Sequence, residues 1–485
     1  MVLRSRKNSG RSLTGFVCLC SAGLVLSGTA AGQSSGISLQ DLSAFRDPGK
    51  SWQVAADVSA DLNKRNVLFP ARGAGVLVNL PDRKHPGQDL YSRAEYGDME
   101  LELDYMMAPG SNSGIYLQGR YEVQLLDSWG VTSAPRPGDN GGIYQRWDEQ
   151  RPEGQKGYEG YAPRTNVSRA PGLWQHMKIA FRAPRFDAAG RKTANARMLR
   201  VELNGVVIHE DVELMGPTRG AIGGGDEKPV GPLRIQGDHG AVAFRNIRIK
   251  TGEPGEEKRG FSRRDEVDPI LVDATSNTIL RSFMDVPGGP RIPHAVSVGS
   301  PRQVHYTYDM DKGMLLQVWR GGFLDATPMW HDRGNGCSRP RGAVLHLGKP
   351  AFTLARLSSP DAAWITDSTG TGYRPRGYVL DEQDRPAFRY LMYGAAVTDA
   401  IKVLEDGHGL RRELTVENPA EGLYAKLAEG SVIEAQPGGL YIVDGRSYYL
   451  QLEDAKGVKP VVRKTGERQE LIVPVKGKLA YSILF

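Results

Sequence analysis

The stretch DMELELDYMM, residues 98–107, decides the fold class of the N-terminal half of this chain. Apolar side chains occupy every second position from Met99 to Tyr105, and carboxylates occupy the positions between them. Successive side chains of an extended strand point to opposite faces, so one face of this segment is apolar and the other is charged. The pattern predicts a strand of a sheet that has one face in a core and the other in water.

The same kind of pattern extends on both sides of this strand. From residue 42 to residue 250, short alternating runs are separated by Gly, Pro, Asn and Asp, as is typical of an all-β sandwich. The run ARMLRVELNGVVIHEDVEL indicates a hairpin that turns at Asn204 and Gly205. In VAFRNIRIK the apolar side changes partway, which either a bulge near Arg245 and Asn246 or burial of both faces would explain.

The second half of the chain repeats the β-rich pattern after a break. The segment TGEPGEEKRGFSRRDEV, residues 251–267, is charged and lacks apolar periodicity, so it is interpreted as an interdomain linker. Residues 268–485 are again strand-rich, and helical periodicity is nearly absent from both halves. The sequence therefore predicts an all-β protein, with a second β-sandwich-like domain of unassigned role after the linker. A group of residues in this half is interpreted as core and turn residues in preference to a second ligand surface: Trp319, Phe323, Asp325, Trp330 and His331.

The N-terminus has the features of a secretory signal. Residues 1–32 contain a basic start, a short apolar run and then small residues before Gln33. The pattern predicts cleavage and export to the periplasm or the exterior, without a stable membrane anchor. After cleavage Cys337 would be the one remaining thiol, so the stability of the mature chain would depend on its core and not on an internal disulfide.

The bulk composition is that of an ordinary globular protein. The chain has 485 residues, of which 40% are hydrophobic and 24% are charged, with a formal net charge of +6. Several of the positive charges lie in the predicted signal, and no Lys/Arg stripe is interleaved with aromatic residues. This distribution argues against a nucleic-acid partner. The sequence does not determine the oligomeric state.

Polar residues that could carry chemistry gather in two stretches. In YEVQLLDS, residues 121–128, Glu122 and Gln124 share the strand face opposite to the apolar residues, as either a solvated surface or the polar floor of a cleft. In GPLRIQGDHG, residues 231–240, Asp238 precedes His239 in a glycine-lined turn. This pair is either ordinary turn chemistry or a proton-transfer pair, because His titrates near neutral pH.

A long segment between the strands is the third feature of interest. Residues 129–172 are rich in Gly, Pro and Tyr and lack periodicity. Loops of this length are uncommon unless they bind or catalyse. Their aromatic residues, Tyr144, Trp147, Tyr158 and Tyr161, favour an ordered contact surface over a floppy insertion.

Together these residues carry a resemblance to a known family. SNSGIYLQGRYEVQLLDS, GGIY, LNGVVIHEDVELMGPT and GPLRIQGDHGAVAFRNIRIK are similar, in this order, to the 3-keto-disaccharide hydrolase domain across residues 42–250. The resemblance implies a concanavalin A-like jelly-roll β-sandwich related to family-16 glycoside hydrolases, with a sugar site on the concave face of a sheet. The Glu-x-Asp-x-x-Glu pattern of family 16 is absent, which argues against standard double displacement.

The resemblance also implies a reaction. A ketone at C3 of a sugar acidifies the C2 proton, so that a base can remove it and the glycosidic oxygen can leave, with water adding afterwards. We expect His239 or Glu122 as the base and Asp238 as its partner or as the acid. The expected substrate-binding residues are Tyr116, Gln124, Asp127, Tyr144, Tyr161, Gln236 and Arg245.

Two matters stay open at this stage. A divalent cation, calcium or another, held by oxygen ligands would fit the keto chemistry, but no His/Cys metal spacing is present, and no cofactor is certain. The alternative to an exported enzyme acting on 3-keto-glycosides is a non-catalytic carbohydrate-binding or docking protein, which would use the same polar residues for hydrogen bonds.

Overall fold

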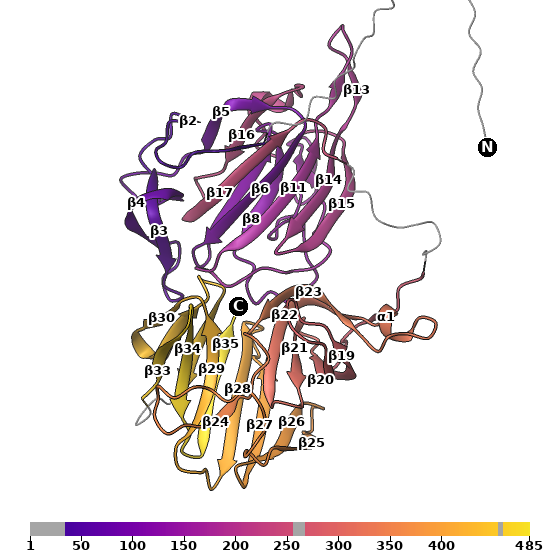
Figure 1. Cartoon of the computed structure of the whole chain (residues 1–485). Coiled ribbons are helices and arrows are strands. Elements are labelled where there is room, and N and C mark those ends of the chain that lie inside the picture. Colours follow the sequence, from indigo (N-terminus) through magenta and orange to yellow (C-terminus); the bar gives the residue numbers. More distant parts are fainter. Residues whose placement is uncertain (1–33, 256–266, 454–458) are drawn as a thin grey trace, which may run out of the picture.

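The computed structural model describes residues 34–255, 267–453 and 459–485. The predicted signal, residues 1–32, and most of the predicted linker lie outside these ranges. Two β-rich domains follow one another along the chain, and the chain ends beside their junction (Figure 1). In the described ranges, helix is limited to α1 (Thr327–Trp330), η1 (Ile222–Gly225) and η2 (Pro437–Gly439). No helix in these ranges is long and apolar enough to cross a membrane.

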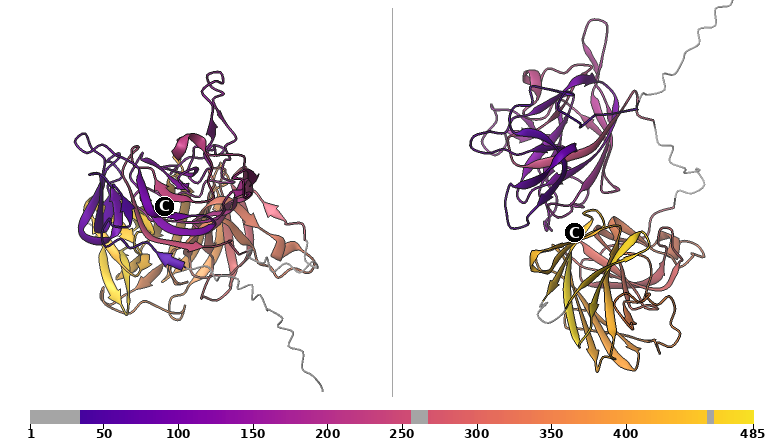
Figure 2. Two further views of the ribbon diagram at one scale, coloured as in Figure 1. Left: turned by 90° about the horizontal axis from the view of Figure 1, so that it is seen from above. Right: turned by 60° about the vertical axis from the view of Figure 1, so that its left-hand side comes forward.

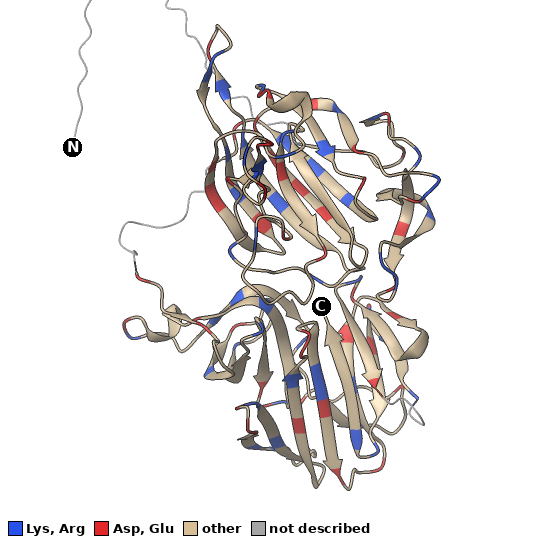
Figure 3. Cartoon of the chain, turned by 180° about the vertical axis from the view of Figure 1, so that it is seen from behind, with Lys and Arg blue, Asp and Glu red and all other residues tan. Residues whose placement is uncertain are grey.

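A large sheet forms one layer of the N-terminal domain. Its order is β15-β14-β11-β6-β17-β4-β3, with β1 paired to β17. The strands are β1 (Ser34–Gly36), β3 (Trp52–Ala60), β4 (Leu68–Asn79), β6 (Met99–Met107), β11 (Gln175–Arg182), β14 (Ala196–Leu203), β15 (Val206–Leu214) and β17 (Val242–Thr251). The segment with the strict alternation is β6, in which Leu101 and Leu103 are buried between the layers. On its outer face, acidic and basic positions lie on neighbouring strands, as in the pair Lys250 and Glu100 (2.9 Å; Figure 3).

A smaller sheet forms the other layer. Its order is β2-β5-β16-β7-β8, and its strands are β2 (Phe45–Arg46), β5 (Leu90–Tyr96), β16 (Gly231–Ile235), β7 (Asn112–Leu117) and β8 (Tyr121–Leu126). Leu103 of the large sheet belongs to the same apolar cluster as Val123 and Leu125 of the small one. This shared core confirms the predicted all-β sandwich. It also places Glu122 and Gln124 on the outer face of the small sheet, because side chains alternate along β8.

Two local predictions are confirmed. Asn204 and Gly205 connect β14 to β15 with positive φ angles of 52° and 80°, as a tight two-residue hairpin requires. The pairing of β17 with β6 shifts register between Arg245 and Arg248, where Asn246 has φ 53°. The bulge lets both halves of β17 turn their apolar residues to the core.

The long segment after β8 is ordered. It contains the paired short strands β9 (Arg146–Trp147) and β10 (Gly157–Tyr158), and Ile143 bridges Val123 on one side and Tyr161 on the other. A further short pair, β12 (Arg185–Phe186) with β13 (Lys192–Ala194), lies at the end of the domain remote from the C-terminal half (Figures 1 and 2). The segment is therefore ordered, as its aromatic residues predict, and its role as a contact surface stays a prediction.

The C-terminal domain contains three sheets around one large apolar cluster. The first has the order β18-β22-β21-β20-β19, with β23 on β22: β18 (Leu271–Val272), β19 (Thr278–Met284), β20 (Ile292–Gly299), β21 (Val304–Asp309), β22 (Met314–Asp325) and β23 (Arg339–His346). Trp319 and Phe323 on β22 are buried, in agreement with their interpretation as core residues.

The other two sheets complete this domain. One has the order β24-β29-β34-β33: β24 (Leu354–Arg356), β29 (Leu423–Gly430), β34 (Arg468–Pro474) and β33 (Val461–Thr465). The other has the order β25-β26-β27-β28-β35-β32-β31-β30: β25 (Arg374–Leu380), β26 (Pro386–Met392), β27 (Ala395–Val403), β28 (Gly409–Glu417), β35 (Lys478–Leu484), β32 (Tyr448–Glu453), β31 (Leu440–Val443) and β30 (Ile433–Gln436).

The long N-terminal segment also makes the contact between the domains. The Trp129 ring stacks on the His408 ring with centroids 3.6 Å apart, and its indole N–H donates to the Phe485 carbonyl oxygen over 2.9 Å. The Tyr449 hydroxyl donates to the Pro171 carbonyl oxygen over 2.9 Å. Both ends of the segment are thus held by the C-terminal domain.

Candidate functional site

A row of five polar and aromatic residues crosses the outer face of the small sheet. Register pairs Arg46 with Tyr91, Tyr91 with Arg234, Arg234 with Tyr116, and Tyr116 with Glu122. Directly opposed residues of antiparallel strands project to the same side. Each of the five strands therefore contributes one side chain to this row, which we call the outer row.

Glu122 is the buried end of the outer row. Its residue exposure is 2%, and a Cβ atom added at Gly114 would overlap with its carboxyl group, so the glycine on β7 provides the space that the carboxyl occupies. The backbone N–H of Glu122 donates to the Thr218 hydroxyl over 3.1 Å. Burial raises the pKa of Glu122 to about 8, against the opposing effects of Tyr116 and Arg234. At neutral pH this carboxyl group is therefore mostly protonated.

Arg234 is the cation of the outer row nearest to Glu122. Its guanidinium lies 4.1 Å from the centroid of the Tyr116 ring and 2.5 Å from the Asp89 carboxylate. It also donates to the Gly220 carbonyl oxygen, while its Nε is buried and has no hydrogen-bond partner within the described residues. Arg234 thus forms its ion pair with Asp89. Within the described residues the Glu122 carboxyl group has no ion-pair partner.

The residues of the outer row other than Glu122 and Tyr116 were missed by the sequence analysis. A signal for one of them was present, because Arg234 lies two positions before Gln236 in GPLRIQGDHG and so shares its face. Tyr91 and Arg46 lie far away in the sequence and carry no such signal. Only the cross-strand register brings them together with Glu122.

Gln124 connects the outer row to the Asp238–His239 turn. Its side-chain amide donates to the Asn112 side-chain oxygen over 2.5 Å and to the Ser113 carbonyl oxygen over 3.2 Å. The Asn112 backbone N–H in turn donates to the His239 carbonyl oxygen over 3.3 Å. Gln124 is buried, so its contacts position neighbouring groups and leave little surface for a ligand.

The Asp238–His239 turn provides the exposed titratable groups. Both side chains are 51% exposed, and the Asp238 carboxylate is hydrogen-bonded to Nδ1 of His239. Burial raises the pKa of Glu122, and the negative charges of Asp89 and Asp238 add to this effect. The partly exposed Gln236 lies on the same stretch as Asp238. The domain thus contains an exposed carboxylate–imidazole pair whose charge acts on a buried carboxyl group.

Arg245, a predicted substrate-binding residue, lies on the large sheet and does not join the outer row. Its Nε donates to Asp104 over 3.2 Å, and its guanidinium lies 4.1 Å from the Trp174 ring centroid. Asp104 also accepts from His176 over 2.8 Å and has a pKa lowered to about 2, because these hydrogen bonds outweigh its burial. This cluster occupies the outer face of the large sheet, and the core separates it from Glu122.

Tyr161 also leaves the predicted site. It pairs with Ile143, which pairs with Val123, so it shares the core-facing side of β8 and packs against the apolar cluster. Its hydroxyl donates to the Glu213 carbonyl oxygen over 3.1 Å. Tyr144 follows Ile143, and alternation therefore turns it to the side of Glu122.

Asp127 has a structural role in this fold. One carboxylate oxygen accepts from the Gly110 backbone N–H over 2.7 Å, and the other accepts from the Trp129 backbone N–H over 3.3 Å. These bonds hold the turn after β8. Its carboxylate is thus engaged with the backbone and does not join the outer row.

The carboxyl groups near the outer row do not form a metal site. Asp89 is paired with Arg234, Glu122 is mostly protonated, and Asp238 bonds His239. Across residues 34–255, 267–453 and 459–485, no group of three or more His, Cys, Asp or Glu side chains is arranged to hold a metal ion. These residues therefore do not provide a site for the divalent cation that would fit the keto chemistry.

Comparison with known proteins identifies the N-terminal sandwich. Residues 40–250 match the family model of the 3-keto-alpha-glucoside-1,2-lyase-like domain. One solved structure of a proposed glycosyl hydrolase from Parabacteroides distasonis is 26% identical, with 45% of this chain and 84% of that chain covered and a TM-score of 0.30. A second from the same organism is 19% identical, with 45% and 100% covered and a TM-score of 0.29. No curated protein matches the sequence.

The family match covers the domain that carries Glu122, Asp238 and His239. It confirms the resemblance seen in the sequence and supports a carbohydrate-active, glycosidase-like domain at residues 40–250. The C-terminal domain lies outside the matched range.

Proposed function

We propose that the N-terminal domain, as a 3-keto-alpha-glucoside-1,2-lyase-like domain, cleaves the glycosidic bond of 3-keto-glycosides by elimination. The observation that carries this proposal is the buried Glu122, with a pKa of about 8, beside the exposed Asp238–His239 pair. Elimination needs one group that accepts a proton and one that gives a proton at the same pH. Two titratable groups in such different environments suit these two roles.

The reaction balances with these two groups. His239 accepts the proton from C2 of the sugar, which the C3 ketone has made acidic, and Asp238 orients the imidazole and stabilises its positive charge. The C2 electron pair delocalises onto the C3 carbonyl as an enolate, and it then forms a C1=C2 double bond as the C1–O bond breaks. Glu122 gives its proton to the departing oxygen. A water molecule then adds its hydroxyl to C1 and gives a proton to Glu122, while His239 returns its proton to C2, which yields the free 3-keto sugar and restores both groups.

Other residues of the same face support these roles. Arg234 places a positive charge beside Tyr116 and Glu122, and this charge would offset the negative charge that develops on the enolate. Tyr91, Tyr144 and Gln236 are partly exposed and would contact the sugar.

Access to Glu122 requires a movement. The segment 218–222 is bonded to the outer row at two points. The Thr218 hydroxyl accepts from the Glu122 backbone N–H, and the Gly220 carbonyl oxygen accepts from Arg234. The proposal therefore includes displacement of this segment when the substrate binds. Lid segments that exclude water until the substrate arrives are common in enzymes of this kind of chemistry.

A non-catalytic carbohydrate-binding protein is the second candidate. It would use the exposed residues of the same face for hydrogen bonds. The buried, protonated Glu122 favours the enzyme, because strongly shifted carboxyl groups are concentrated at catalytic sites.

Product analysis with the mature chain, residues 33–485, tests the proposal. The substrates are a 3-keto-glucoside and its parent glucoside, each with and without EDTA. We expect cleavage of the keto substrate alone, and a loss of at least about 100-fold in kcat in His239→Ala and Glu122→Gln. His176→Ala, whose imidazole also bonds a carboxylate but on the large sheet, is the matched control and should keep full activity.

Two results would contradict it. Equal cleavage of the parent glucoside would show that the ketone is not used. Saccharide binding without cleavage of any substrate would favour the binding protein.

A further inference from the structure

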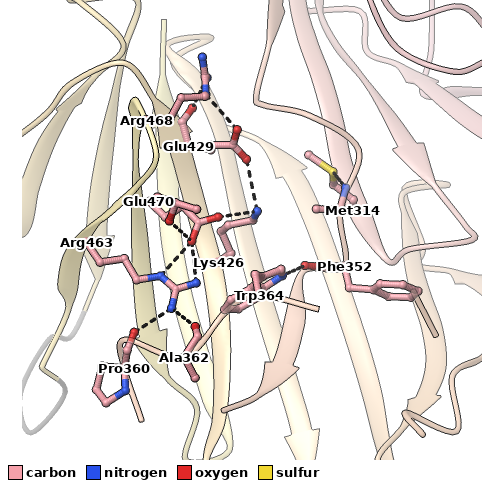
Figure 4. Close-up of polar contacts among 12 residues, drawn as sticks. Met314, Phe352, Pro360, Ala362, Trp364, Lys426, Glu429, Arg463, Arg468 and Glu470 are labelled. Atoms are coloured by element: carbon pink, nitrogen blue, oxygen red, sulfur yellow. Dashed lines mark hydrogen bonds and ion pairs between the residues drawn. The ribbon is translucent and has the colours of Figure 1, made fainter. Parts of the chain in front are cut away.

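The C-terminal domain has an open pocket that the proposed reaction does not use. It lies between edge strand β33, the segment 361–366 and residues 349–351, and has a volume of about 830 Å³. This volume is in the range of small-molecule sites, about 300–1,000 Å³. Its lining includes Trp364, Lys426, Glu429 and Arg463, which Figure 4 shows, and also Val462.

The floor of the pocket is a buried ionic network. Lys426 Nζ lies 3.0 Å from the Glu470 carboxylate and 3.3 Å from that of Glu429. Arg463 lies 2.7 Å from Glu470, and Arg468 lies 2.9 Å from Glu429. Burial opposes ionisation of Glu470, but Lys426 and Arg463 outweigh it and hold its pKa below the ordinary value. The network is therefore charged, and each of its carboxylates is paired with cationic side chains of the same network.

Trp364 forms an aromatic wall above this network. Its indole N–H donates to the Phe352 carbonyl oxygen over 2.8 Å, and Lys426 Nζ lies 5.5 Å from the centroid of its ring. Arg463 donates to the carbonyl oxygens of Pro360 over 2.8 Å and Ala362 over 2.5 Å. The network thus fixes the segment that carries the ring, and Figure 4 shows the ring next to Lys426 and Arg463.

These features select a class of ligand. A simple anion or cation would find its counter-charge already paired, so it would have to break a buried ion pair. Sugar hydroxyls both donate and accept, so they can bond to carboxylates and to cationic groups without separating them. The C–H face of a sugar ring can pack on an indole. We propose that this pocket binds a neutral saccharide, at a site separate from the outer row.

Titration calorimetry on the mature chain tests this proposal. The probes are cellotriose, maltotriose and laminaritriose, with trigalacturonate as the acidic comparison. We expect at least one neutral trisaccharide to bind and Trp364→Ala to weaken it at least tenfold. Trp330→Ala removes an exposed tryptophan of the same domain, with 49% exposure, and should leave binding unchanged.

Further variants test whether a loss of binding comes from unfolding, and whether the binding takes place at the N-terminal site. Val462 lines the pocket and is 37% exposed, so Val462→Arg fills the pocket without removing a core contact, and it should abolish binding while Tm stays unchanged. Glu122→Gln should keep the binding, whatever its effect on cleavage. The proposal is overturned if no neutral trisaccharide binds, if binding survives both Trp364→Ala and Val462→Arg, or if trigalacturonate alone binds.

Discussion

Glu122 in the N-terminal domain and Glu470 in the C-terminal domain are buried to nearly the same degree, with 2% and 4% exposure, and yet they hold opposite protonation states. Glu470 contacts both Lys426 and Arg463, which together keep its pKa below the ordinary value despite its burial. Within the described residues no cation forms an ion pair with Glu122, since its neighbour Arg234 is paired with Asp89, and burial raises the pKa of Glu122 to about 8.

The difference shows what decides the role of a buried carboxyl group. Desolvation disfavours the charged form of both residues, and in Glu470 the contacts with Lys426 and Arg463 reverse this effect. A buried carboxylate that contacts cations stabilises the fold, as Glu470 does in the pocket floor. A buried carboxyl group without a contacting cation keeps its proton at neutral pH and can give this proton to a substrate.

The largest expected effect that sharpens the comparison is on catalysis. Glu122→Gln should lower kcat on a 3-keto-glucoside by about 10²–10⁴-fold, because the amide cannot supply a proton. Wild-type activity should also fall as pH rises through about 8, where Glu122 loses its proton, and the residual activity of the variant should lack this alkaline decline. Activity of the wild type that stays constant from pH 7 to pH 10 would contradict the role of Glu122 as the acid.

The corresponding change in the C-terminal domain should affect stability and not catalysis. Glu470→Gln leaves Lys426 and Arg463 buried without their shared counter-charge, which should cost about 3–5 kcal/mol of unfolding free energy. Denaturant unfolding measures this loss, and kcat of the folded variant serves as the control. A large fall in kcat with intact stability would reverse the roles assigned to the two carboxyl groups.

The pH dependence of stability should distinguish the two groups further. The folded-state pKa of Glu122 lies above its unfolded value, so its contribution is complete below the unfolded pKa and is lost as pH rises through about 8. Relative to Glu122→Gln, the wild type should therefore lose about 2.5 kcal/mol between pH 5 and pH 7, at about 1.4 kcal/mol per unit. Denaturant unfolding of both proteins at the two pH values measures this. Parallel stability of wild type and variant across this range would show that Glu122 ionises freely.

The smallest expected effect comes from the space that Glu122 occupies. Gly114→Ala places a methyl group where the carboxyl lies, and such overpacking should cost about 1–3 kcal/mol and displace the acid. We expect a fall in kcat that exceeds the change in KM for the 3-keto-glucoside. Gly205→Ala, in the exposed hairpin turn between β14 and β15, is a glycine control remote from the site. If Gly114→Ala kept full kcat, the position of the Glu122 carboxyl would not matter.

The sequence predicted those features that depend on local pattern. Alternation identified β6, the Asn204–Gly205 turn and the shared face of Glu122 and Gln124. It could not show that Glu122 is buried and protonated, because this depends on Gly114 and on the segment that contains Thr218.

Errors arose where adjacency in sequence does not mean adjacency in space. His239 and Arg245 are close in the chain, but the chain passes from one sheet to the other between them, so Arg245 pairs with Asp104 on the far face. Tyr161 was placed on the sugar face, although its pairing through Ile143 turns it to the core. The sequence did not predict the ionic network in the pocket floor, because Lys426 and Glu470 come together only through the pairing of β29 with β34.

The protonation of Glu122 is the central claim, and a carboxyl titration tests it most directly. Residues 33–485, labelled with ¹³C at the glutamate side-chain carboxyl, would be followed by NMR from pH 4 to pH 10, with Glu122→Gln and Glu470→Gln assigning the two signals. We predict that the Glu122 signal titrates near pH 8, whereas the Glu470 signal titrates below its ordinary value of 4.5. A Glu122 signal that titrates near its ordinary value of 4.5 would contradict it.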